Sequence, residues 1–322
     1  MRRAGAVALV TLTFALIRVQ HASPVAFALG AEHMQSVTGV EIPDWYHSYP
    51  WLAVGLVGDG LVFVSQTVDP FGFEGHTTRL ASAGYRFTRI GYPLAAKVIT
   101  LGVDDLAPVG LFVLSTAGIA LAAWAATRFR DRVGWKAWLL VANPAVLFGY
   151  LMGTAEPLGI GLAGLALLSG SRWAAAAMAT VRPDLLVTLL NRRRLAVVGG
   201  LVAVAVLSAA LPLFGSIHAG HNLTWPLVDY FSATGSSVWL IAVAALGMVG
   251  VGIRRRDWAC IASGLLVLCF AEPILEVPVN AWRTSGPLWI ALAVSSQRPN
   301  GEPPIAEAPV RRGPALVPKG VC

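Results

Sequence analysis

Residues 107–127 read APVGLFVLSTAGIALAAWAAT, a run of 21 residues without a charged side chain. The hydrocarbon core of a bilayer is about 30 Å thick, and about 20 helical residues cross it. The strands of a membrane β-barrel would alternate polar and apolar residues with a period of two, and this run shows no such alternation. The run therefore has the length and composition of a membrane-spanning helix.

The same apolar character extends over most of the chain. Of its 322 residues, 56% are hydrophobic and 13% are charged, whereas a soluble globular domain carries about 25% charged residues. Further apolar runs lie at 4–17, 137–152, 157–170, 195–214, 237–253 and 258–271, with weaker ones at 84–102, 172–190 and 280–295. We therefore predict an all-α, polytopic helical membrane protein with about ten transmembrane helices.

The basic residues indicate which ends of these helices face the cytoplasm. The net charge is +7, and the clusters lie at 2–3, 128–136, 192–194 and 254–256. Such clusters between apolar runs follow the positive-inside rule for cytoplasmic loops, so we expect membrane lipids and no nucleic acid as partners. Arginine in preference to lysine, together with abundant alanine, is typical of a GC-rich bacterium, which predicts a bacterial inner (plasma) membrane protein.

The topology divides the chain into a transmembrane domain, 1–295, and a tail, 296–322. With the N-terminus cytoplasmic and the first span uncleaved, residues 22–83 form a large first external loop with interfacial helices. The tail is rich in proline, glycine and charge, and we predict it to be disordered and cytoplasmic. Segment 84–102 is ambiguous: as a full span it places Arg128 to Arg132 outside, against the rule, and as a re-entrant segment it places them inside. We predict a full span.

Asp59 is the first candidate functional residue. It stands between two glycines in the apolar stretch 51–67. An acid at membrane depth is costly and marks a functional site by default, and flanking glycines allow a substrate to approach the backbone. The alternative is a solvated aspartate in an interfacial turn. Asp69 precedes a proline, which is typical of a turn, and an auxiliary acid is its other interpretation.

Residues 85–97, YRFTRIGYPLAAK, supply three cations. In one helix, Arg86, Arg89 and Lys97 would share a face by their spacing. Cations that follow an acidic outer loop suit an anion such as a lipid-linked phosphate. The alternative is interfacial arginines beside a tyrosine belt.

Several ionisable residues also lie inside apolar segments. They are Glu156, Arg182, Asp184, Glu272, Glu276 and Arg283. Arg182 and Asp184 are spaced to pair with each other. Because such groups rarely face lipid, together they predict a polar cavity inside the bundle.

A set of short motifs completes the pattern. They are Asp59-Gly60, Arg89-Ile90-Gly91-Tyr92-Pro93-Leu94, Asn143-Pro144, Glu156-Pro157-Leu158 and Trp282-Arg283. In this order they resemble the GT-C superfamily of membrane glycosyltransferases, particularly bacterial relatives of the glycosylphosphatidylinositol mannosyltransferases and polyprenyl-phosphomannose-dependent enzymes. The likeness runs from about residue 50 to 295.

The resemblance implies a function. A sugar, mannose or a related hexose, would move with inversion from a polyprenyl-phosphate donor to a lipid or cell-wall glycan acceptor on the outer face. Asp59 would be the general base, and Arg86, Arg89, Lys97 and Arg283 would bind the donor phosphate. Asp69 and Glu156 would assist as auxiliary acids. Some relatives bind a divalent metal through loop acids, but no residue of this chain is assigned as a metal ligand.

Two other classes of function stay open. An ion-coupled transporter or flippase would use the buried charges as a relay, and it predicts inverted repeats, which the sequence does not show. A non-catalytic GT-C-like scaffold would bind a lipid or a partner enzyme. This class stays open because Leu61-Val62-Phe63-Val64 follows Asp59, where the relatives carry tyrosines.

Overall fold

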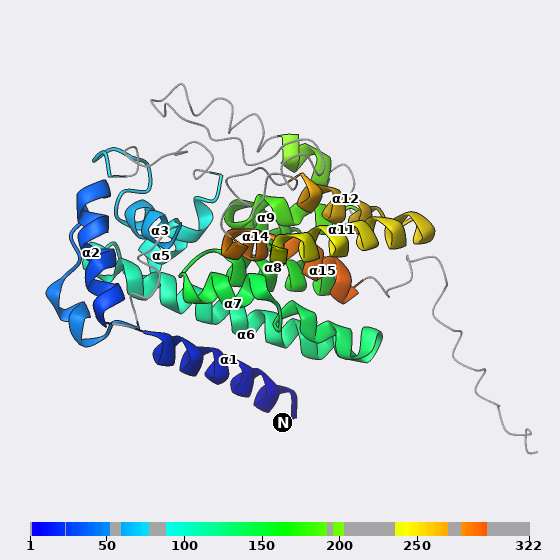
Figure 1. Cartoon of the computed structure of the whole chain (residues 1–322), viewed down its shortest axis with the longest axis horizontal. Helices are drawn as coiled ribbons and strands as arrows, with labels where there is room; N and C mark the ends of the chain where they lie inside the picture. Colours follow the sequence, from blue (N-terminus) through cyan, green and yellow to red (C-terminus); the bar gives the residue numbers. More distant parts are fainter. Residues whose placement is uncertain are drawn as a thin grey trace, which may run out of the picture.

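The computed structural model describes residues 2–22, 24–51, 59–76, 88–191, 196–202, 236–269 and 278–294. Within these ranges every regular element is a helix (Figure 1), which confirms the all-α prediction. Three helices are long and apolar enough to cross a membrane: α1 (Arg2–His21), α6 (Ala107–Val133) and α11 (Ser236–Arg255). The other helices with described bounds have 15 residues or fewer, so the expected count of about ten spans is not confirmed.

The shorter helices fall into two groups. One group gathers at one end of the long axis of the molecule (Figure 1) and comprises α2 (Pro24–Thr38), η1 (Asp44–Ser48), α3 (Asp59–Val68), α5 (Gly91–Ile99) and η2 (Asp104–Leu106). The second group packs along α6 and α11 and comprises η3 (Gly134–Leu140), α7 (Pro144–Leu151), α8 (Glu156–Ser169), α9 (Arg172–Val181), η4 (Pro183–Leu189), α12 (Trp258–Leu268), α14 (Pro278–Thr284) and α15 (Gly286–Val294). We call the stretch 22–106, which holds the first group, the loop layer.

Helix α1 lies antiparallel beside α6 (Figure 1). Near its start, Arg3 Nη2 lies 2.5 Å from Asp131 Oδ2, close to the end of α6. Near its end, Arg18 is buried and donates hydrogen bonds of 2.8 Å to the carbonyl oxygens of Tyr150 and Trp51. The Arg18 guanidinium also lies 5.0 Å from the centre of the Phe112 ring. These contacts fix both ends of α1, while its leucines at 9, 12 and 16 stay exposed, as expected for a lipid-facing surface.

The structure bears on the ambiguous segment 84–102. Its described part, 88–102, contains one helix, α5, of nine residues and a length of about 14 Å, which is shorter than the hydrocarbon core of a bilayer. These residues therefore do not form the single long spanning helix that the sequence predicted. Because α1 and α6 are antiparallel (Figure 1), the stretch between them begins and ends at the same end of α6.

Helix α5 begins later than the sequence predicted. The expected helix over 85–97 would have placed Arg89 and Lys97 on one face, but Arg89 lies in the turn 88–90 and α5 starts at Gly91. Gly91 permits close packing, since a Cβ there would lie 2.7 Å from the Cβ of Thr180. Arg86 lies outside the described residues.

Helix α3 is covered by protein. The positions from Leu61 to Val68 are buried, including the polar Ser65, Gln66 and Thr67. The Phe63 ring meets the Tyr92 ring edge-to-face at 5.1 Å, so α3 packs against α5. The interfacial position of 51–67 stays a prediction, and residues 52–58 lie outside the described ranges.

Helices α6 and α8 pack in parallel through small residues. A Cβ at Gly161 would lie 2.6 Å from the Gly118 carbonyl oxygen, and one at Gly164 would lie 2.7 Å from Ala125 Cβ. Glycine and alanine let two backbones approach closely, which is the usual means of helix packing in lipid. This close contact places the start of α8 beside Gly118, which lies near the middle of α6.

We predict that Gly118→Ala destabilises the protein by about 1–3 kcal/mol, the usual cost of overpacking. The added methyl group would lie 2.5 Å from Leu158 Cα, and backbone atoms cannot move aside cheaply. Thermal unfolding in detergent measures the effect. The matched control is Gly247→Ala on α11, where a Cβ meets nothing within 4 Å and where alanine should be neutral or stabilising by about 0.5–1 kcal/mol. Equal unfolding midpoints for the two variants would contradict the close α6–α8 contact.

Candidate functional site

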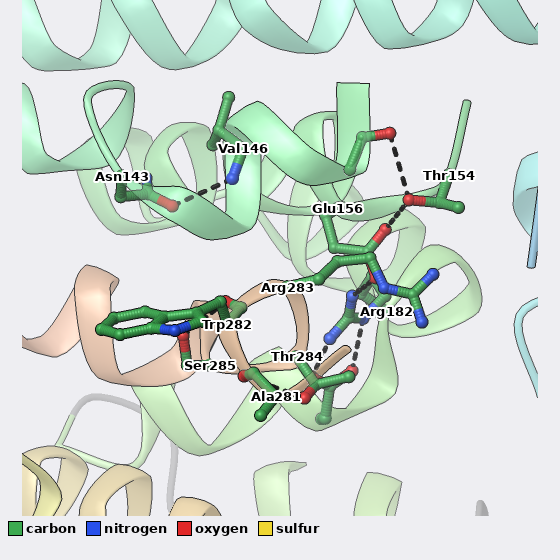
Figure 2. Close-up of polar contacts among 12 residues, drawn as sticks. Asn143, Val146, Thr154, Glu156, Arg182, Ala281, Trp282, Arg283, Thr284 and Ser285 are labelled. Atoms are coloured by element: carbon green, nitrogen blue, oxygen red, sulfur yellow. Dashed lines mark hydrogen bonds and ion pairs between the residues drawn. The ribbon is translucent and has the colours of Figure 1, made fainter. Parts of the chain in front are cut away.

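Local sequence signals bring several helix ends together beside α6. The Asn143 side chain accepts a hydrogen bond of 3.0 Å from the Val146 N–H and caps α7 (Figure 2). Gly153 takes a positive φ of 65° in the turn after α7, and Pro157 in the first turn of α8 suits a helix start. Helix α9 ends before Pro183, because a proline disfavours the helical conformation of the residue that precedes it. Glu156 and Arg182 are thus placed at adjoining helix ends.

Glu156 lies at the centre of the site. Its carboxylate forms an ion pair with Arg182 and accepts a hydrogen bond from the Thr154 hydroxyl. Arg283, from α14, places its Nε 3.6 Å from Glu156 Oε1. Figure 2 shows these side chains converging from the starts and ends of different helices. Glu156 and Arg182 are each only 1% exposed, so solvent screens their charges weakly.

Two further charged residues complete the group. Arg182 holds Asp184 in a two-point contact, with Nε at 2.8 Å from Oδ1 and Nη2 at 2.5 Å from Oδ2, which confirms the predicted pairing. Arg89 is buried and acts electrostatically on Asp184. We call Arg89, Glu156, Arg182, Asp184 and Arg283 the buried charge cluster. Among the described residues, the cluster holds three guanidinium groups and two carboxylates; the Asp184 side chain is 22% exposed, and the other four residues are buried.

Tyr92 connects the loop layer to the cluster. Its hydroxyl lies 2.7 Å from Ser115 Oγ and 3.3 Å from the Gly153 carbonyl oxygen, three residues before Glu156. Its ring packs on Phe63, one turn after the first residue of α3, which is Asp59. The backbone of α3 is therefore linked through Phe63 and Tyr92 to the turn that carries Glu156. The side chain of Asp59 lies outside the described part of the structure.

Two predicted site residues serve other contacts. Lys97, near the end of α5, donates to the Val68 carbonyl oxygen at 2.5 Å and to Asp104 Oδ1 at 3.2 Å. The Asp69 carboxylate accepts hydrogen bonds from the backbone N–H groups of Glu74 and His76, at 3.1 and 3.2 Å. Asp69 thus organises the loop after α3, in agreement with the turn interpretation. Lys97 lies at the end of α5 opposite Arg89, so the two cations do not form one group.

The sequence did not point to Arg18 or Thr154. Arg18 had a detectable signal, since it is an arginine close to the end of the first apolar run. Thr154 had none, because buried threonines are common in membrane helices and only the fold shows its contact with Glu156. Neither could be assigned a partner before the helices were placed.

Metal binding gains no support from the described residues. Among them, no group of three or more histidine, cysteine, aspartate or glutamate side chains could hold an ion. Glu272 and Glu276 lie outside the described ranges.

Comparison with known proteins gives no relative. No family model, curated protein or solved structure matches this chain.

We predict that Glu156→Gln lowers the free energy of unfolding by about 3–5 kcal/mol, the cost of removing one partner of a buried ion pair. The variant keeps the shape of the side chain but removes the negative charge that faces Arg182 and Arg283. Thermal unfolding in detergent measures the loss. Asp131→Asn is the matched control: its partner Arg3 is exposed, and surface pairs contribute about 0–1 kcal/mol. A Glu156→Gln midpoint equal to that of the control would contradict the central place of this carboxylate.

Proposed function

We propose that the chain is a GT-C-type membrane glycosyltransferase. It would transfer mannose or a related hexose, with inversion, from a polyprenyl-phosphate donor to a lipid or cell-wall glycan acceptor. The observation that carries the proposal is the gathering of three arginines, Arg89, Arg182 and Arg283, in the buried charge cluster, next to a loop layer that contains Asp59. Cations in a membrane protein are expensive and usually mark a substrate pathway.

The arginines of the cluster suit a departing phosphate. When the bond between the anomeric carbon and the donor phosphate breaks, negative charge develops on the phosphate oxygen. Arginine binds phosphate through a planar fork of donors, and fixed cations in a poorly screened site stabilise such charge strongly. Arg89 and Arg283 would supply the positive field in this proposal.

Asp59 would supply the base. The acceptor hydroxyl oxygen attacks the anomeric carbon, its proton passes to the Asp59 carboxylate, and the polyprenyl phosphate leaves from the opposite face. Proton removal by a positioned carboxylate contributes about 10²–10⁴-fold to such a step. The packing of Phe63 on Tyr92 supports the assignment, because it keeps the start of α3 close to the turn before Glu156.

The orientation in the membrane is also part of the proposal. The end of α6 carries Arg128, Arg130 and Arg132, and the parallel α8 brings Arg172 to the same end. Trp135 and Trp173 are 71% and 86% exposed there, as expected of an aromatic belt beside cytoplasmic arginines. We therefore assign this end, together with the N-terminus, to the cytoplasm of a bacterial cell. The loop layer and the active site would then face outward. The tail 296–322, proposed to be cytoplasmic, lies outside the described residues.

The orientation predicts opposite labelling of two exposed positions. In a variant without the native cysteines, Asp105→Cys should react with a membrane-impermeant maleimide on intact spheroplasts. Asp131→Cys should react only after the membrane is permeabilised. Asp105 is close to the start of α6 and Asp131 is close to its end. Labelling of both positions from the same side would contradict a membrane-spanning α6, and the reversed pattern would place the loop layer in the cytoplasm.

The activity is tested by Asp59→Asn in the purified full-length protein. Transfer of radiolabelled mannose from polyprenyl-phosphomannose should fall by about 10²–10⁴-fold, while binding of polyprenyl phosphate stays unchanged. Asp44→Asn is the control, because Asp44 is an exposed acid of the same layer, and it should keep full transfer. Unchanged transfer in Asp59→Asn would remove this residue from the mechanism. Binding without any turnover by the unmodified protein would support the non-catalytic scaffold instead.

A further inference from the structure

The turn between α5 and α6 exposes four large apolar side chains within six residues. Val98 is 73% exposed, Ile99 44%, Leu101 90% and Val103 48%. We call these four residues the α5–α6 tip. Scattered single apolar residues are common on protein surfaces, but a contiguous group of this kind marks an interaction surface.

The backbone of the tip is held in a costly conformation. Helix α5 ends in a Schellman motif, in which the Gly102 N–H donates to the Lys97 carbonyl oxygen at 2.8 Å and the Leu101 N–H donates to that of Val98 at 3.1 Å. Leu101 occupies the left-handed position of this motif, with φ of 53°. Glycine usually takes that position because a Cβ is penalised there. An exposed leucine side chain at this position makes no favourable contact with water. An apolar environment accounts for a leucine here.

The tip lies at the end of a membrane span. The end of α5 packs on the first turns of α6, since a Cβ at Gly110 would lie 2.8 Å from the Ala96 carbonyl oxygen and 2.9 Å from Thr100 Cγ2. The candidate membrane span that contains α6 begins at Asp104, directly after the tip. On α6 itself, Val113 is 41% exposed. The tip therefore adjoins the start of a candidate membrane span.

We propose that the α5–α6 tip inserts into the acyl chains of the membrane leaflet on the side of the loop layer. The occupant of this surface is bilayer lipid, because the exposed apolar tip directly precedes a candidate membrane span. Lys97, Asp104 and Asp105 flank the tip in the chain, and the first two pair with each other at 3.2 Å. In this proposal these charges lie at the headgroup level, and the four apolar side chains reach into the acyl chains.

A neighbouring loop extends the same surface. Lys97 also binds the carbonyl oxygen of Val68, the last residue of α3. Phe71 and Phe73 follow it, with exposed fractions of 57% and 88%. In this proposal the loop layer contacts the leaflet through the α5–α6 tip and the loop after α3. This inference rests on the spanning α6 and does not require the proposed transferase activity.

Environment-sensitive fluorescence tests the insertion. Leu101→Cys, in full-length protein without the native cysteines, is labelled with nitrobenzoxadiazole and reconstituted in phosphatidylcholine–phosphatidylglycerol vesicles. Its emission should shift to the blue and should lose most of its intensity when lipids with a spin label high on the acyl chain are included. Val103→Cys should behave in the same way, so the test does not depend on one variant. Ser36→Cys, an exposed position of α2, is the control and should be quenched by aqueous iodide.

The outcomes separate lipid from other coverings. Strong quenching by spin-labelled lipid at both tip positions supports the proposal. Quenching by iodide at the level of the Ser36→Cys control would show a water-exposed turn and would overturn it. Protection from both quenchers would show that protein, such as a second copy of this chain, covers the tip, which also overturns the lipid assignment.

Discussion

The ion pair between Glu156 and Arg182 constrains the whole arrangement of short helices. Both groups are buried, and removing one partner of a buried ion pair is strongly destabilising. The pair requires the start of α8 and the end of α9 to meet at one depth. Arg283 then fixes α14 on the other side of the same carboxylate. Three helices that are too short to cross the membrane are therefore held at a common point, and their polar ends are satisfied by one another.

Close backbone packing places this point within the membrane domain. The glycine contacts between α6 and α8 bring Glu156 alongside the middle of a 27-residue helix. Arg18 anchors α1 at a similar level through backbone carbonyls of distant segments. The long helices thus provide a fixed frame, and the charged helix ends are positioned against it. In the proposed function, the same frame would align the donor phosphate with the loop layer.

The loop layer closes the domain on one side and differs from a solvated loop. Its helix α3 is buried by protein, and Tyr92 ties it to the bundle through Ser115 and Gly153. Its turn after α5 exposes leucine and valine. A layer with an apolar inner face and an apolar tip is suited to the boundary between lipid and water, where a lipid-linked substrate would present its headgroup.

The sequence by itself determined the helical class, the apolar runs that contain the three long helices, and the pairing of Arg182 with Asp184, because composition, run length and local spacing carry that information; its count of about ten spans is not confirmed. It also singled out Glu156, since an acid in an apolar run is rare. Only the tertiary structure decided that 88–102 does not form one long helix, that Lys97 and Arg89 lie apart, and that Glu156, Arg182 and Arg283 meet. These facts depend on contacts between residues far apart in the chain. Hydropathy indicates whether a residue is in an apolar environment, but it does not indicate which residue it contacts. The antiparallel contact of α1 with α6 is the plainest case, because the pairing of Arg3 with Asp131 joins residues 128 positions apart.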